Sequence, residues 1–102
     1  MTETVLNLTD LQQALDELNQ DAAEEWTLIG GRLSRTFRFP DFVAAFGFMT
    51  RVAIHAEKMN HHPDWNNVYS TVNVSLVTHE AGGITSLDFA LAKKMERLAA
   101  AP

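Results

Sequence analysis

The sequence predicts an α+β fold with the element order α-β-β-α-β-β-α. Three observations carry this prediction. Apolar residues recur at helical spacing in three segments, and they alternate with polar residues in the stretches between. Short turns also join the strands, which leaves no room for crossover helices. The strands therefore predict a four-stranded antiparallel sheet with the helices packed on one face. At 102 residues the chain predicts a single domain over 1–102.

The first helix is predicted over 10–19. Thr9 with Gln12 three residues later matches a capping box, and leucine and alanine follow at helical spacing. The polar segment 19–25 predicts a loop. Beyond it, apolar residues alternate on both sides of the glycine pair 30–31, which predicts a β-hairpin.

The middle helix is predicted over 41–59. Pro40 and Asp41 mark its start, because proline suits the first turn and aspartate can cap it. Pro63 disfavours helix at the residue before it, so the helix should end near Asn60. Most faces of this helix are apolar, and such a helix needs partners on more than one side. We therefore expect self-association, or a partner protein on the same surface.

The second pair of strands is predicted from the alternation over 68–78. This segment is one strand, or two shorter strands joined by a tight turn near 66–67. The small residues at 81–83 break the pattern. Thr85 then caps the final helix, with Asp88 at the third helical position.

Composition excludes several classes of function. The formal charge is −5 and the eight basic residues form no run, so we expect no direct binding to nucleic acid. No stretch approaches the roughly eighteen apolar residues of a membrane span. The acidic N-terminus lacks the features of a signal peptide, so we expect a cytoplasmic protein. The absence of cysteine excludes disulfides and thiol nucleophiles.

The chemistry concentrates around His61, His62 and His79, which fall within nineteen residues. Imidazole has an ordinary pKa of about 6.5 and exchanges protons near neutrality. The cluster therefore predicts a proton-transfer pocket for a small planar substrate. Glu57 lies one helical turn before His61 and can face it. The fourth histidine, His55, is interpreted as a solvated or structural residue.

Other interpretations of these residues stay open. Glu57 can be a solvated side chain, and Asp88 can serve only as a helix cap. Trp65 and Tyr69 can stack on a flat ligand or simply pack in the core. Three histidines and a glutamate can also bind zinc, although no two histidines have the spacing of the helical H-E-x-x-H motif.

A spaced motif joins these residues, E-x3-H-H-P-x5-Y-x9-H-x8-D, carried by Glu57, His61, His62, Pro63, Tyr69, His79 and Asp88. It resembles the pterin-4a-carbinolamine dehydratase family, and the likeness extends over about 26–98. The resemblance implies an α+β fold that assembles as dimers or dimers of dimers. It also implies removal of water from 4a-hydroxytetrahydropterin to give quinonoid dihydropterin, which is then reduced and returned to aromatic amino acid hydroxylases. Animal members also act as dimerisation cofactors of a homeodomain transcription factor.

The resemblance implies two groups of site residues: catalytic His61, His62 and His79, and substrate-binding Glu57, Pro63, Trp65, Thr78 and Asp88. The reaction needs an acid for the leaving hydroxyl and a base at N5, which imidazoles can supply. We expect no metal and no cofactor, because the pterin is the substrate. Our hypothesis assigns proton transfer to His62 and His79, and contact with the 4a-hydroxyl or the ring to His61. The alternative is a protein-interaction module, a dimerisation cofactor or transcriptional coactivator, that uses the apolar middle helix.

Overall fold

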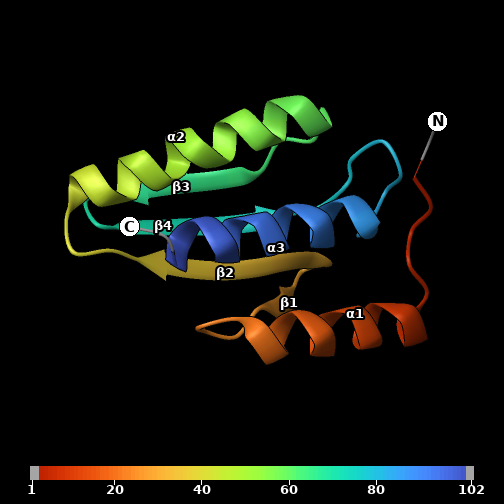
Figure 1. Ribbon diagram of the computed structural model, residues 1–102. Coiled ribbons are helices and arrows are strands. Elements are labelled where there is room, and N and C mark those ends of the chain that lie inside the picture. The colour runs from red at the N-terminus through yellow and green to blue at the C-terminus, as the bar shows by residue number, and fades with distance from the viewer. Residues whose placement is uncertain (1–2, 101–102) are drawn as a thin grey trace.

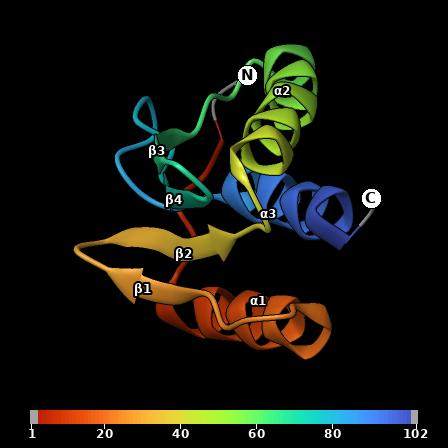
Figure 2. The same cartoon turned by 90° about the vertical axis from the view of Figure 1, so that its left-hand side faces the viewer.

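The computed structural model describes residues 3–100 and confirms the predicted element order. The described elements are α1 (Leu8–Asp21), β1 (Thr27–Ile29), β2 (Arg32–Arg38), α2 (Phe42–Met59), β3 (Asp64–Val68), β4 (Thr71–Leu76) and α3 (Ser86–Ala100). The four strands form one antiparallel sheet in the order β1-β2-β4-β3. Helices α2 and α3 lie on one side of the sheet, and α1 lies beyond β1 (Figures 1 and 2).

The core lies between the sheet and the helices α2 and α3. Alternation along β2 and β4 turns one side of each strand inward, and the register pairs Leu33 with Leu76 and Phe37 with Val72. Phe37 packs against Phe48 of α2, with ring centroids 4.8 Å apart. The buried residues of the two helices include Ala45, Phe48, Val52 and Ala56 of α2, and Phe89, Leu91, Ala92 and Met95 of α3.

The first helix begins earlier and ends later than predicted. Its N-cap is Asn7, whose side chain accepts a hydrogen bond from the Asp10 amide at 2.8 Å, so the predicted capping box at Thr9 is wrong. Asparagine is as strong a cap as threonine, and it stands two residues upstream. The predicted loop 19–25 is also too long. Asn19 is helical, and its side chain bonds both the N–H and the C=O of Trp26.

The turn between β3 and β4 lies at residues 69–70, so the prediction of a turn near 66–67 is wrong. Asn66 stays in the strand and accepts a hydrogen bond from Asn73 across the sheet at 3.0 Å. Asn67 donates to the carbonyls of Tyr69 and Thr71, which holds the turn. Tyr69 is the first residue of this two-residue loop. It takes a positive φ of 52°, as the first loop residue does in the turns that favour tight hairpins.

The predicted caps of the other two helices are confirmed. Asp41 caps α2 by accepting from the Ala44 amide, and Asn60 ends it in the left-handed conformation. At the start of α3, the Thr85 hydroxyl accepts from the Leu87 amide, while Asp88 accepts from the Thr85 amide. Together these bonds cap the helix as predicted, with the Thr85 hydroxyl bound by the second helical amide and the Asp88 carboxylate reaching back from the third position.

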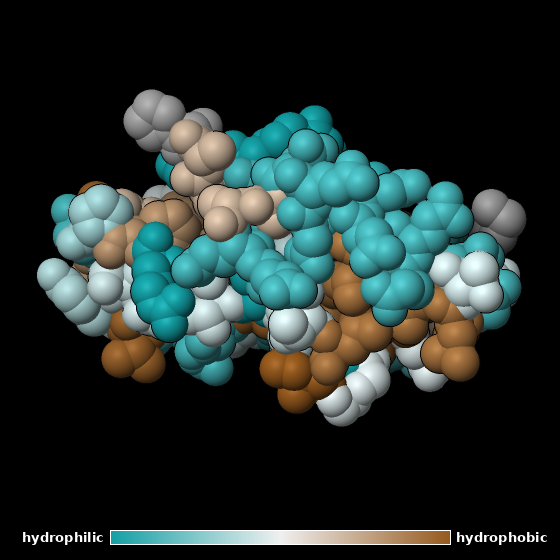
Figure 3. Space-filling view, turned by 90° about the horizontal axis from the view of Figure 1, so that it is seen from below, coloured by the Kyte–Doolittle hydropathy of each residue, from teal (hydrophilic) through white to brown (hydrophobic). Residues whose placement is uncertain are grey.

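None of the helices in the described part of the chain is long and apolar enough to cross a membrane. Seen from the side of α1, the surface over this helix is mostly hydrophilic, and hydrophobic residues gather in a band beside it (Figure 3). The exposed large hydrophobic residues include Leu28 and Ile29 of β1.

Glu96 ties the segment before β1 to the core. Its carboxylate accepts from the Trp26 indole at 2.8 Å and the Ala23 amide at 3.3 Å, and pairs with Arg35 Nε at 2.9 Å. Burial lowers the pKa of Arg35, and Glu96 acts against that change. A buried guanidinium is tolerated only with such a partner, so Glu96 makes Arg35 acceptable inside the fold.

We expect Glu96→Ala to lower the free energy of unfolding by about 3 kcal/mol, because it removes the main counter-ion of the buried Arg35. Urea denaturation measures this change. The control is Glu17→Ala on the exposed face of α1, for which we expect a change within about 0.5 kcal/mol. Equal effects of the two variants would contradict the role given to Glu96.

Candidate functional site

Three chain segments meet at one end of the molecule: the end of α2, the loop after β4 and the start of α3 (Figure 1). They carry six of the predicted site residues: Glu57, His61, His62, Thr78, His79 and Asp88. The C-cap Asn60 turns the chain sharply out of α2, so His61 points back into the fold while His62 lies at the surface. A bridge between Thr78 and Gly83 closes the loop, and Gly82 uses a positive φ of 82° to make the turn.

Asp88 is the centre of this end. Its side chain is fully buried, and one oxygen, Oδ2, accepts from the Thr78 hydroxyl and the Thr85 amide, both at 2.9 Å. The other, Oδ1, contacts His61 Nε2 at 2.6 Å. A buried carboxylate is costly unless donors surround it, and here three donors do so.

The directions of these hydrogen bonds indicate which ring nitrogen of His61 carries a proton. The Thr78 hydroxyl gives its single proton to Asp88, so in the 2.7 Å contact between the two threonines the Thr85 hydroxyl is the donor. An ionised Asp88 acts only as an acceptor, and Nε2 of His61 then carries the proton in the 2.6 Å contact. The nitrogen that His61 leaves for a ligand is Nδ1.

Glu57 pairs with a different histidine from the one expected. Glu57 bonds His62 Nε2 at 2.9 Å, so the expectation that Glu57 faces His61 is wrong. The cause is the left-handed turn at Asn60, which sends the two neighbouring imidazoles in different directions. Both members of this pair are exposed, with 61% of the His62 side chain accessible.

His79 lies beside Asp64, the first residue of β3. Its Nε2 is 3.4 Å from Asp64 Oδ2, and the same oxygen is bound by Arg32 of β2. The hydrogen bond from Arg32 is the main cause that lowers the pKa of Asp64, with a smaller contribution from His79 in the same direction. Sequence reasoning did not select Asp64 or Arg32, because this pairing depends on strand order rather than on spacing.

The three histidines thus share one arrangement. Each contacts a carboxylate through Nε2, and the three carboxylates come from three different elements: α3, α2 and β3. A carboxylate on one ring nitrogen orients the imidazole, fixes its tautomer and stabilises its charged form. The arrangement suits proton donation and removal at Nδ1.

The other predicted residues take different places. Trp65 is half-buried and packs against the core, on the side of β3 that faces the helices, while Pro63 links His62 to the start of β3. Thr78 is buried and bonded to Asp88. Tyr69 is exposed in the β3–β4 turn, at the opposite end of the sheet from the end of α2, so the structure does not bring it to the histidines.

Within residues 3–100, no three side chains of His, Asp or Glu are placed to hold a metal ion.

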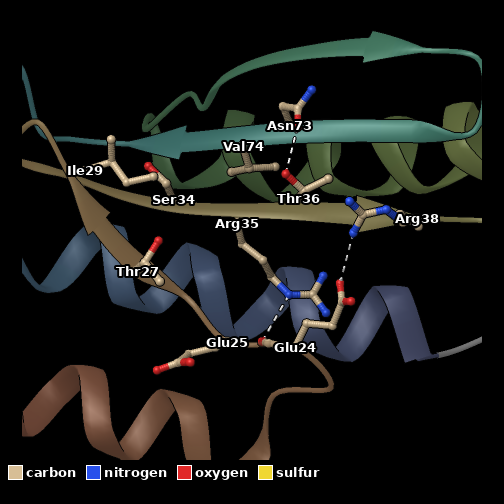
Figure 4. Close-up of a pocket in the computed structure, with 10 residues that line it drawn as sticks. All are labelled: Glu24, Glu25, Thr27, Ile29, Ser34, Arg35, Thr36, Arg38, Asn73 and Val74. Atoms are coloured by element: carbon tan, nitrogen blue, oxygen red, sulfur yellow. Dashed lines mark hydrogen bonds and ion pairs between the residues drawn. The ribbon is translucent and has the colours of Figure 1, made fainter.

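A surface hollow of about 540 Å³ lies elsewhere, where the segment before β1 leaves the edge of β2 (Figure 4). Its residues come from 24–38 and from β4, and none of them belongs to the predicted site. Both arginines of its lining are engaged within the protein: Arg38 lies 3.7 Å from Glu24, and Arg35 donates to the Glu24 carbonyl. The hollow therefore offers little free positive charge to recognise a ligand.

Comparison with known proteins agrees with the motif. The family model described as pterin 4 alpha carbinolamine dehydratase matches residues 4–98. A protein of Solibacter usitatus that carries the family's name is 50% identical over 97 residues, which is 95% of this chain and 97% of the relative. One from Mesorhizobium japonicum is 54% identical and covers 93% of this chain and 94% of its own.

Solved structures show the same fold. A crystal structure from Brucella melitensis, described as a transcriptional coactivator/pterin dehydratase, superposes with a TM-score of 0.85 at 41% identity, over 94% of this chain and 99% of that one. A pterin dehydratase-like protein identified as a RuBisCO assembly factor in the alpha-carboxysome shares the fold alone, with a TM-score of 0.66 at 23% identity over 78% of this chain and 95% of that one. On the family match and the close relatives, this chain belongs to the pterin-4-alpha-carbinolamine dehydratase family.

Proposed function

We propose that this protein is a hydro-lyase that dehydrates 4a-hydroxytetrahydropterin to quinonoid dihydropterin by histidine acid–base catalysis. The observation that carries the proposal is the buried pair of His61 and Asp88, oriented by Thr78, at the end of the molecule where His62 and His79 also lie. Membership of the family and the description of the Brucella melitensis relative as a pterin dehydratase support it.

The reaction balances with two proton transfers. An acid protonates the 4a-hydroxyl, the C4a–O bond breaks, and water leaves. A base removes the proton from N5, and the electron pair of that N–H bond becomes the second bond between N5 and C4a. Positioned acids and bases contribute about 10²–10⁴-fold to such steps.

We assign the proton transfers to His62 and His79. Both are exposed and can exchange protons with solvent between turnovers, and each has a carboxylate at Nε2 that orients the ring. We assign contact with the 4a-hydroxyl or the pterin ring to His61, because a buried and fixed ring suits positioning. Glu57 and Asp88 would orient the imidazoles, and Trp65, Pro63 and Thr78 would shape the pocket.

The same proposal covers the setting of the reaction. The chemistry needs no metal and no cofactor beyond the pterin substrate. The product would be reduced and returned to an aromatic amino acid hydroxylase, in tetrahydrobiopterin recycling in the cytoplasm.

A second candidate function is that of a protein-interaction module built on α2. This helix exposes Phe42, Val43, Phe46 and Ile54, all large apolar side chains. Beside this stripe, Arg51 Nε is buried and has no hydrogen-bond partner among the described residues. Burial of the stripe against a second copy of α2 would give a homodimer or homotetramer. The description of the Brucella melitensis relative as a transcriptional coactivator also favours a binding role for this fold.

Stopped-flow measurement of 4a-hydroxypterin decay tests the dehydratase. We expect the protein to accelerate decay, and the acceleration to survive a chelator. His62→Ala with His79→Ala should lower turnover by about 10²-fold or more, because both proton-transfer groups are lost.

The matched control is His55→Ala, which removes the fourth histidine and should leave turnover unchanged. Decay that is equally fast with and without the protein would favour the interaction module. Full turnover in the double variant would rule out the assignment of His62 and His79.

Replacing Asp88 by Asn tests the tautomer of His61. The Thr78 hydroxyl and the Thr85 amide both donate at the Oδ2 position and will select the amide oxygen there. The amide N–H₂ then faces Nε2 of His61 and moves the ring proton to Nδ1. We expect turnover to fall by about 10²-fold or more, as inverted tautomers do in catalytic triads.

Nitrogen-15 NMR of His61 reads the tautomer directly, and Asp10→Asn on exposed α1 is the control. Normal turnover in Asp88→Asn, with the proton still on Nε2, would contradict the arrangement.

Phe46→Glu tests self-association. A charge in the middle of the exposed α2 stripe should shift the mass measured by light scattering towards the monomer, because burying an unpaired carboxylate is costly. Leu8→Glu on α1 is the control, since Leu8 is more exposed but lies on another helix. A mass unchanged by Phe46→Glu would place any interface elsewhere.

A further inference from the structure

Two side chains, Arg32 and His79, contact the same oxygen of Asp64, Oδ2. Arg32 binds this oxygen through Nη1, and His79 Nε2 lies 3.4 Å from it. Neither Arg32 nor Asp64 is part of the spaced motif, yet Asp64 joins Arg32 to one of its histidines.

The sheet explains how Arg32 reaches this position. The register aligns Ser34 of β2, Ser75 of β4 and Asp64 of β3 across three strands. This row lies on the side of the sheet opposite the helices, because the residues between them along β2 and β4 are the buried ones. Arg32 is two residues from Ser34 and therefore on the same face, and its long side chain crosses β4 to reach Asp64 of β3.

We propose that Arg32 is a positioning residue for the dehydration, which rests on the proposed function: it holds Asp64 against His79, so that His79 presents Nδ1 to the substrate. Arg32 does not touch the reacting atoms. It acts through Asp64, and Asp64 acts through the ring orientation and tautomer of His79.

A comparison of the His61–Asp88 and His79–Asp64 pairs shows why Asp64 needs a second contact. His61 and Asp88 lie 2.6 Å apart and are buried, so packing holds them. His79 and Asp64 lie 3.4 Å apart, with 64% and 50% of their side chains exposed. An exposed pair at that distance contributes little by itself, and its carboxylate can rotate away. A second donor on the same oxygen restricts that rotation.

Arg32 also keeps Asp64 in the form that the arrangement needs. Its hydrogen bond lowers the pKa of Asp64, so the carboxylate stays ionised further into the acid range than an isolated aspartate. An ionised Asp64 is only an acceptor, and it therefore keeps the proton of a neutral His79 on Nε2.

The test is a double-mutant cycle on the full-length protein, followed by 4a-hydroxypterin decay. Arg32→Gln should lower kcat about three- to tenfold with little change in KM or in thermal midpoint, because the pair on the surface adds little stability. Arg32→Lys should restore kcat to within about twofold, since only one donor contact is required. In the His79→Ala background, Arg32→Gln should have no further effect, because its target is gone.

The matched control is Arg38→Gln, which removes an arginine from the same face of the same strand, where it pairs with Glu24. It should leave kcat unchanged. Nitrogen-15 NMR of His79 gives a readout apart from activity: Arg32→Gln should raise the share of the ring with its proton on Nδ1.

Two results would overturn the proposal: an Arg32→Gln variant with the kcat of the wild type, or a loss of kcat that is equally large when His79 is already alanine. An unchanged His79 spectrum in Arg32→Gln would overturn it as well. An inactive wild type would instead overturn the proposed function, whereas an active wild type with any of these results would overturn only the role of Arg32.

Discussion

The buried carboxylate of Asp88 is the constraint on which this end of the molecule depends. Removing a charge from water is costly, and Asp88 is tolerated because the His61 ring, the Thr78 hydroxyl and the Thr85 amide all donate to it. These donors come from the end of α2, the loop after β4 and the start of α3. One side chain therefore caps a helix, closes a loop and orients an imidazole. The two interpretations open at the level of sequence, a helix cap or a site residue, describe the same set of hydrogen bonds.

The three histidine–carboxylate pairs differ in how firmly they are held. The contact is 2.6 Å and buried for His61, 2.9 Å and exposed for His62, and 3.4 Å and exposed for His79. A buried pair holds a ring in one orientation, whereas an exposed pair can lose and regain protons from water. The buried pair is therefore suited to positioning the substrate, and the two exposed pairs are suited to proton exchange. This separation is the physical basis for assigning contact with the substrate to His61 and proton transfer to the other two.

Local signals in the sequence predicted the parts of the fold that local interactions determine. The caps at Asp41 and Thr85 and the end of α2 at Asn60 each depend on residues within one helical turn, and the structure confirms them. The start of α1 was missed because two good capping residues stand close together and the pattern does not choose between them. The turn at 69–70 was missed because the strand position of Asn66 depends on Asn73, which is distant in sequence. Non-local pairing also explains the site: spacing found the three histidines, but only the sheet order and the turn at Asn60 decide which carboxylate each one meets.

Helix α2 links the candidate site to the surface available for assembly. Its exposed apolar stripe runs from Phe42 to Ile54, and the next turn carries Glu57, which contacts His62. Because a helix is a stiff rod, a partner that buries the stripe also restricts the position of its C-terminal turn. That turn carries Glu57 of the exposed His62–Glu57 pair. The other exposed pair, His79–Asp64, is bound by Arg32 of β2 instead. Assembly through α2 would therefore restrict the position of His62, whereas the position of His79 depends on contacts with residues of the sheet. The two proton-transfer groups thus depend on different parts of the fold.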